Sequence, residues 1–306
     1  MLPIVLLAVS LLIVVILGFD TEARRELKAA AGFRDAVSAS ALNWAGLQTA
    51  RAVLLEDTIR DLKAGQTFDG LTDSWKLLPS PLSLGEGLVN VSISDERSKL
   101  NINDLALPKD SKQREATVLR FKRLFTALNL DPRLVETLTD WVDEDDVPER
   151  NGAETRYYES LTPPYRTANE AVQTLDELRL VRGMTDDSFQ RLQQYITVYP
   201  FLSDGWININ TADPIVIQSL NAKITPAMAM DIVQARPFRS LKDLDKVMSV
   251  EAVAKELRLV NAYDVWSDYF IVRISAEIGE TTKNSRAVVQ RSRADGSSTI
   301  VAFEIE

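Results

Sequence analysis

The 306-residue chain carries 35 Lys and Arg against 44 Asp and Glu, which gives a formal net charge of -9, and it contains neither cysteine nor histidine. Disulfide frameworks, thiolate zinc sites, cysteine nucleophiles and histidine-dependent catalytic triads are therefore excluded. Nucleic acid is not an expected partner either, because phosphate binding requires a positive field.

The N-terminal segment is apolar and uncharged. Residues 1–19 read MLPIVLLAVSLLIVVILGF, and a helix of this length spans roughly 28 Å, close to the thickness of a bilayer core. A secretory signal peptide would have a basic region before the apolar run and a small-residue cleavage site after it. We therefore expect a transmembrane anchor, and the missing basic leader favours Met1 as the first residue of a processed chain.

The helical pattern continues beyond the anchor. Val37, Leu47 and other apolar residues recur at helical spacing, and no further proline occurs before Pro79. A cation and a glycine in residues 63–65 are typical of a helix C-terminus. One helix is therefore predicted from the bilayer to about Leu62, half of it in lipid or in a fibre and half packed on a globular head.

Strand patterns lie on both sides of a long helical region. Alternating polar and apolar side chains occur in residues 88–93, 270–276, 287–290 and 301–305. An Asp295-Gly296 turn joins the last two, so hairpin-linked antiparallel strands with one buried face are expected. The segment 64–86 is rich in Gly, Pro and Ser and is expected to be a loop.

The predicted fold is α+β: a long N-terminal helix packs on an antiparallel sheet, and a large all-α domain is inserted after the first strand. The expected segments are an anchor at 1–19, its helical continuation at 20–63, a sheet at 64–95 and 266–306, and a helical domain at 96–265 with an acidic loop at 140–169.

The helical region contains an internal repeat. Residues 100–103, Leu-Asn-Ile-Asn, return as Ile-Asn-Ile-Asn at 207–210, and residues 174–181 are echoed by 240–247. Two related helical modules are therefore expected. The first holds a much longer segment between its landmarks, and the excess falls on the acidic loop.

The second module partly resembles the helix-hairpin-helix module of some DNA-binding proteins, in residues 207–212 and 232–244. Such modules use a glycine-containing hairpin to bring backbone amides close to phosphate. The matching segment here, residues 220–225, has no glycine. We therefore expect this module to make protein contacts rather than to bind nucleic acid.

Six carboxylates crowd the ten positions from 140 to 149. Oxygen ligands without nitrogen or sulfur suit calcium. An EF-hand is the wrong template, because Val147 and Pro148 stand where that loop needs a ligand and a glycine. The alternative is a solvated acidic loop. Calcium is favoured because a loop as long as 143–169 is usually functional or disordered unless something ties it down.

Several motifs of this region, taken in order, resemble the central signature of K-type minor pseudopilins of the type II secretion system. The motifs occupy residues 138–145, 151–154, 157–158, 163–169 and 177–184. The resemblance extends from the anchor helix to the last strand. It implies a pilin-like fold, with a long N-terminal helix on a four-stranded sheet and a helical domain inserted after the first strand.

The resemblance also implies calcium held by acidic residues near the signature. Carried over to this chain, the implied ligands are Asp143, Asp145, Asp146 and Glu154, with Asp140 as a weaker candidate.

The fifth residue bears on assembly. Pilin-like proteins in general carry a glutamate at the fifth mature position, which neutralises the N-terminal amine of a neighbouring subunit. This chain has Val5, and K-type subunits are similar in lacking that acid. Met1 and Val5 are therefore candidate assembly and anchor residues of a tip subunit.

The resemblance implies a structural function and no enzymatic activity. The expected protein has a single span in the bacterial inner membrane and a periplasmic head. It joins I-type and J-type minor pseudopilins to initiate or cap the pseudopilus, is processed by prepilin peptidase, and has secreted substrates as further candidate partners. Two alternatives are a membrane-tethered, calcium-dependent module that binds exported proteins, and a hydrolase with paired carboxylates, for which an acidic chain offers no specific signal.

Overall fold

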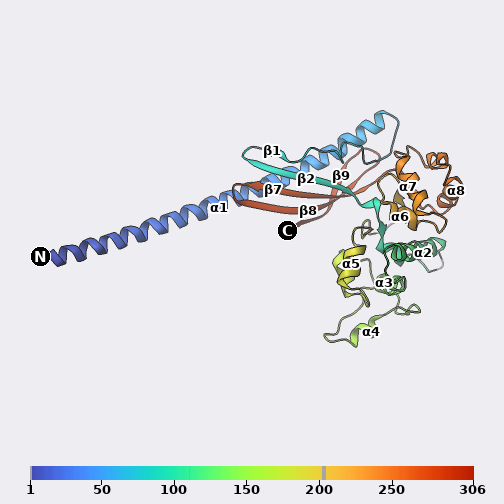
Figure 1. Cartoon of the computed structure of the whole chain (residues 1–306), viewed down its shortest axis with the longest axis horizontal. Helices are drawn as coiled ribbons and strands as arrows, with labels where there is room; N and C mark the ends of the chain where they lie inside the picture. The colour runs from blue at the N-terminus through green and yellow to red at the C-terminus, as the bar shows by residue number, and fades with distance from the viewer. Residues whose placement is uncertain (1, 110, 202–204) are drawn as a thin grey trace.

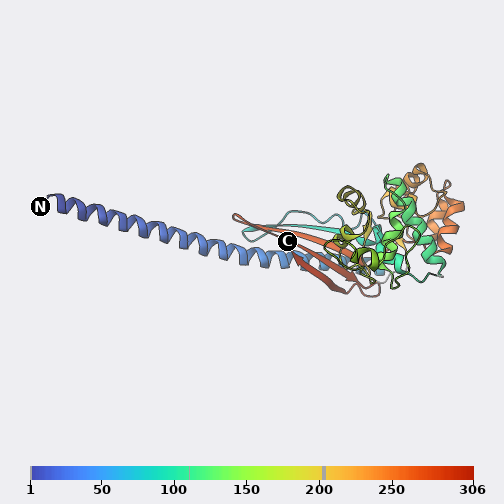
Figure 2. The same ribbon diagram turned by 90° about the horizontal axis from the view of Figure 1, so that it is seen from below.

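The computed structural model describes residues 2–109, 111–201 and 205–306. They form a long rod that ends in a two-part head (Figure 1). The N-terminal end lies at the free end of the rod, the sheet packs along its other half, and the helical domain lies at the far end of the molecule (Figure 2).

Helix α1 forms the rod. It runs from Leu2 to Lys63 without a break, a length of roughly 93 Å at 1.5 Å per residue. Within the described residues it is the one helix long and apolar enough to cross a membrane. Arg60 and Lys63 in its last turn suit the helix dipole, and Gly65 follows in the left-handed region with a φ of 65°.

The second half of α1 packs on the sheet through small residues. Ala39, Gly46 and Ala50 are buried there. A Cβ added to Gly46 would lie 2.9 Å from side-chain atoms of both Val89 and Ile274. Glycine therefore lets the helix backbone come close to the sheet.

The sheet has five antiparallel strands in the order β1-β2-β7-β8-β9. Their bounds are β1 Leu82–Leu84, β2 Gly87–Asp95, β7 Tyr269–Ile278, β8 Thr281–Arg291 and β9 Ser298–Ile305. The expectation of a loop throughout 64–86 is wrong at β1. This edge strand pairs through three residues, which is too short a segment to show an alternating pattern.

Strand β9 also departs from expectation. The alternation predicted a buried face, yet Val301, Phe303 and Ile305 are 36%, 39% and 68% exposed. The cause is position, because β9 is an edge strand of the sheet. Trp44 of α1, itself half exposed, packs edge-to-face on Phe303 with ring centroids 6.1 Å apart, so one apolar surface joins α1 to β9.

The helical domain leaves the sheet after β2 and returns to it at β7. Its helices are η1 Glu96–Ser98, η2 Ile102–Ala106, α2 Lys112–Ala127, α3 Leu134–Val142, α4 Thr155–Glu159, η3 Leu175–Leu180, α5 Asp186–Leu192, α6 Pro214–Ser219, α7 Pro226–Gln234, η4 Leu241–Lys246 and α8 Glu251–Leu259. Two short parallel strand pairs complete it: β3 Leu100–Asn101 with β4 Ile196–Thr197, and β5 Ile207–Asn208 with β6 Tyr263–Asp264.

The internal repeat is visible in the hydrogen bonds of one asparagine per module. Asn103 donates from Nδ2 to the carbonyl of Val172 and accepts at Oδ1 from the amide of the same residue. Asn210 does the same with Phe238. Each asparagine therefore ties the start of its module to the segment that precedes the 3-10 helix η3 or η4.

Two hydrophobic cores stabilise the head. One lies between α1 and the sheet, and the other fills the helical domain. Ile271 and Val288 belong to the second core although they lie on the sheet strands, so the helical domain packs against the face of the sheet opposite α1. The prediction of an α+β fold with a long N-terminal helix, an antiparallel sheet and an inserted helical domain of two modules is confirmed.

Candidate functional site

The acidic loop brings three of the five implied calcium ligands together. Carboxylate oxygens of Asp143, Asp145 and Glu154, which we call the loop cluster, all lie within 4.8 Å of one another. Asp143 is the C-cap of α3 and Glu154 is the N-cap of α4. The ends of two helices therefore hold the cluster in place.

Glu154 has the most unusual environment of the three. The residue is 6% exposed, and neither carboxylate oxygen has a hydrogen-bond donor among the described residues. Burial, and then the charges of Asp140, Asp143 and neighbouring acids, raise its pKa to about 8. A buried carboxylate without donors is costly, so a proton or a cation must balance this group.

The other two members have basic neighbours on one side. Asp143 Oδ2 lies 3.1 Å from Arg114 and 3.7 Å from Lys109, whereas its Oδ1 is buried without a hydrogen-bond donor in the described chain. Asp145 Oδ2 lies 2.6 Å from Lys109, and this hydrogen bond lowers the pKa of Asp145. The two basic side chains thus neutralise one side of the cluster and leave Glu154 uncompensated.

The remaining two implied ligands make other contacts. Both oxygens of the fully buried Asp140 accept from the Glu149 amide, at 3.0 and 3.2 Å, and burial raises the pKa of Asp140 to about 6. Asp146 is exposed and accepts from Asn169 Nδ2 at 3.2 Å. Asp140 therefore shapes the loop, and Asp146 lies at its surface.

Asn169 is a candidate ligand that the sequence analysis missed. Its Nδ2 reaches the backbone oxygen of Asp145 and the side chain of Asp146, while its Oδ1 is buried with no hydrogen-bond donor in the described parts of the chain. Its φ of 45° lies in the left-handed region, which asparagine tolerates. The available signal was its place at the end of the motif at 163–169.

This set of groups fits calcium. Asp143, Asp145, Glu154 and Asn169 offer oxygen atoms, three of the four side chains carry an oxygen without a donor, and the formal charge is strongly negative. Calcium takes six to eight oxygen ligands in a flexible shell, so backbone carbonyls or water would complete the coordination.

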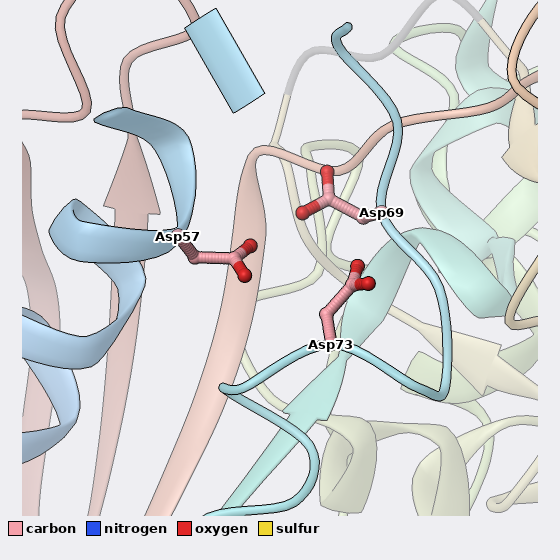
Figure 3. A group of neighbouring side chains, drawn as sticks. All are labelled: Asp57, Asp69 and Asp73. Carbon is pink, nitrogen blue, oxygen red and sulfur yellow. The ribbon is translucent and has the colours of Figure 1, made fainter. Parts of the chain in front are cut away.

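A second group of three carboxylates lies where α1 meets the head. Asp57 of α1 and Asp69 and Asp73 of the following segment point toward one another (Figure 3). We call this group the junction cluster. Arg291 Nη2 donates to both oxygens of Asp69 at 2.5 and 2.6 Å, and Nη1 lies 3.6 Å from Asp57. The protein therefore supplies a cation of its own to this cluster.

The anchor candidate Val5 lies at the other end of the molecule (Figure 1). Val5 is 57% exposed on the free part of α1, and Met1 lies outside the described residues.

Comparisons with known proteins agree with the signature in the helical domain. Family models described as type II secretion system protein K match residues 98–201 and 207–265, together more than half of the chain. The chain is 27% identical to the type II secretion system protein K of Aeromonas hydrophila, over 95% of this chain and 92% of that protein. It is 28% identical to the protein of the same name from Pseudomonas aeruginosa, over 98% and 90%.

A solved structure has the same fold. A chain in the crystal structure of the GspK-GspI-GspJ complex from the enterotoxigenic Escherichia coli type 2 secretion system superposes with a TM-score of 0.77 and 21% sequence identity. The match covers 90% of this chain and 99% of that one. Signature, family models and fold agree, and the chain therefore belongs to the type II secretion system protein K family, the K-type minor pseudopilins.

Proposed function

We propose that this chain is a structural subunit at the tip of the pseudopilus, where it assembles with I-type and J-type minor pseudopilins and supports protein export. The observation that carries the proposal is the fold similarity over 99% of a chain solved in the GspK-GspI-GspJ complex. Under this proposal the chain initiates or caps the fibre and carries out no catalysis.

The exposed side of α1 supports assembly through this helix. Phe33, Val37 and Trp44 are 73%, 54% and 50% exposed, and their spacings of four and seven residues place them along one side of the helix. They follow the 19-residue apolar segment, in the part of α1 outside a membrane. Contiguous exposed apolar surface of this kind marks a protein interface.

The same proposal includes the cellular location and the processing of the chain. The apolar start of α1 is a single span of the bacterial inner membrane, the head lies in the periplasm, and prepilin peptidase processes the N-terminus. Val5 suits a tip position, because a subunit with no neighbour above it has no amine to neutralise.

We assign calcium a structural role in this function. The positive charge of a bound ion would balance Glu154 and the donor-free oxygens of Asp143 and Asn169. The chain's own residues then hold the loop: Asp140 fixes it through the Glu149 amide, and the ends of α3 and α4 present Asp143 and Glu154. Calcium would thereby stabilise the helical domain without taking part in a reaction.

Co-purification tests the assembly proposal. The tagged full chain is extracted in detergent from cells that also produce I-type and J-type subunits. We expect both partners to co-purify, and we expect the Phe33→Ala, Val37→Ala, Trp44→Ala variant to lose most of them. Met248→Ala is the matched control, because Met248 is 93% exposed but lies in the helical domain. A wild-type chain that retains neither partner would refute the proposal.

A further inference from the structure

An arginine-lined hollow of about 320 Å³ is formed in part by the acidic loop. Three segments form its walls: residues 131–137 at the start of α3, residues 150–152, and residues 182–183 after η3. Two of these segments belong to the sequence signature, at 151–154 and 177–184, but neither contributes to the hollow any of the calcium candidates described above.

The hollow is positive in a chain whose formal net charge is -9. Its charged lining residues are Arg133, Arg150, Arg182 and Asp131. Arg133 is paired with Asp131 through contacts of 2.7 to 3.0 Å. Arg150 makes no ion pair or side-chain hydrogen bond with any described residue, so an excess of positive charge faces the hollow.

Arg182 is held in position at the wall. Its Nη1 donates to the carbonyl of Gly152 at 3.2 Å, and its guanidinium lies over the Tyr157 ring, 4.7 Å from the centroid. Its backbone amide donates to the Tyr158 hydroxyl at 3.0 Å. A guanidinium has five N–H donors, so a positioned Arg182 retains donors for a ligand.

The walls themselves are tightly packed. Gly183 has a φ of 82°, and a Cβ there would lie 2.7 Å from Leu134. A Cβ on Gly152 would overlap the Asp140 carboxylate at 1.8 Å. Close packing of Gly152 and Gly183 against these side chains therefore fixes the segments that carry Arg150 and Arg182, which limits the reorganisation needed to bind a partner.

We propose that this hollow binds a carboxylate of an exported protein, presented on an acidic segment. Arginine pairs with carboxylates through two parallel hydrogen bonds, and the positive lining complements such a segment. The choice of an exported protein rests on the proposed function: fibre neighbours pack along α1, whereas α3 and α4 lie in the helical domain at the end of the molecule far from the free part of α1 (Figure 1).

A peptide-binding measurement tests the chemistry. A fluorescent hexaglutamate peptide is titrated with the full chain in detergent, with hexaglutamine as the uncharged control, and fluorescence anisotropy is recorded. We expect hexaglutamate alone to bind, and Arg150→Glu to weaken binding by roughly tenfold. The matched control is Arg166→Glu, an equal change of charge at a 77% exposed side chain of the same domain that does not line the hollow; it should change binding by less than about twofold.

An export assay tests whether the partner bound in the hollow is an exported protein. Cells producing the Arg150→Glu chain should secrete less of their exported proteins, while the variant still co-purifies with I-type and J-type subunits. Equal weakening of peptide binding by both variants, or no hexaglutamate binding by the wild type, would overturn the carboxylate site. Loss of the I-type or J-type partner from Arg150→Glu would identify a fibre subunit as the occupant and overturn the exported-protein assignment. The failure of wild-type assembly would instead refute the proposed function, so the two results are distinguishable.

Discussion

The loop cluster and the junction cluster each contain three carboxylates within 4.8 Å of one another, yet the protein treats them differently. At the junction, Asp69 receives two bonds from Arg291 and one from the Ser267 amide. In the loop, Glu154 is also buried but receives no donor from any described residue. Proximity of acids is therefore a weak sign of a metal site, and the supply of donors is what separates the two.

The two clusters also differ in which part of the fold they stabilise. The junction cluster lies on α1 and the segment after it, and Arg291 joins both to strand β8. These ion pairs therefore stabilise the head as a whole. The loop cluster joins α3 to α4 inside one helical module. Loss of the junction pairs should therefore destabilise the entire fold, whereas loss of a bound ion should loosen one loop and its surroundings.

The largest expected effect is that of Arg291→Met. Removal of one partner leaves Asp57 and Asp69 as uncompensated buried charges, which destabilises a protein by about 3–5 kcal/mol. Chemical denaturation of the full chain in detergent measures the change in unfolding free energy. Arg60→Met is the control: it also lies near Asp57, at 3.8 Å, but its side chain is 52% exposed, so a loss below about 1 kcal/mol is expected. Similar losses of unfolding free energy for both variants would contradict the role of Arg291 as the cation that neutralises the junction cluster.

The next effect is the loss of calcium stabilisation in Glu154→Gln. At a hundredfold excess of calcium over its Kd, the wild type should gain about 2.7 kcal/mol relative to chelator. The variant should gain far less, and in chelator it should be at least as stable as the wild type, because a neutral glutamine needs neither a proton nor a cation to balance it. Thermal midpoints with calcium and with chelator report the two stabilities, and native mass spectrometry reports the bound ion.

Glu144→Gln is the matched control for that experiment, because Glu144 lies in the same loop but is exposed. It should keep the full response to calcium. Identical midpoints for the wild type in calcium and in chelator, with no bound ion, would leave the loop cluster as an acidic surface loop.

A separate effect should appear in the pH dependence of the junction. Burial, and then the charges of Asp57, Asp69 and Asp61, raise the pKa of Asp73 to about 7, while the Gly70 amide opposes this shift. A carboxyl with a raised folded-state pKa contributes most stability below its unfolded pKa of about 4, and this contribution is lost as the pH rises toward 7. The wild type should therefore lose stability relative to Asp73→Asn across that interval. Thermal midpoints of both proteins from pH 4 to 8 test this, and a constant difference between them would exclude titration of Asp73.

The smallest effect is expected for Asn169→Ala. An amide oxygen is one neutral ligand among six to eight, so calcium affinity should fall by only several-fold, on the order of 1 kcal/mol, with little change in chelator. Calcium titration followed by intrinsic tryptophan fluorescence measures the affinity, because the Trp141 carbonyl accepts a hydrogen bond from the Asn169 amide. An unchanged affinity would remove Asn169 from the ligand set.

Local patterns were sufficient for the main elements of the fold. Helix α1 could be predicted from apolar residues at helical spacing, from the lack of proline between Pro3 and Pro79, and from a cation and a glycine at its end. Each of these signals depends only on residues close together in the chain. The repeat was recognisable because residues 100–103 recur almost unchanged at 207–210. The acidic loop was visible from charge density alone, and three of its five implied ligands do converge.

Other features depend on partners that are distant in the chain. Strand β9 has the alternation of a half-buried strand, but its place at the sheet edge leaves Phe303 and Ile305 exposed. The pairing of Asp69 with Arg291 joins residues 222 positions apart, and no local pattern anticipates it. The sequence by itself determined the elements, the repeat and the excess of acids, because these follow from neighbouring residues. Only the tertiary structure decided which acids receive donors and which lack them, because desolvation and hydrogen bonding depend on what the fold brings into contact.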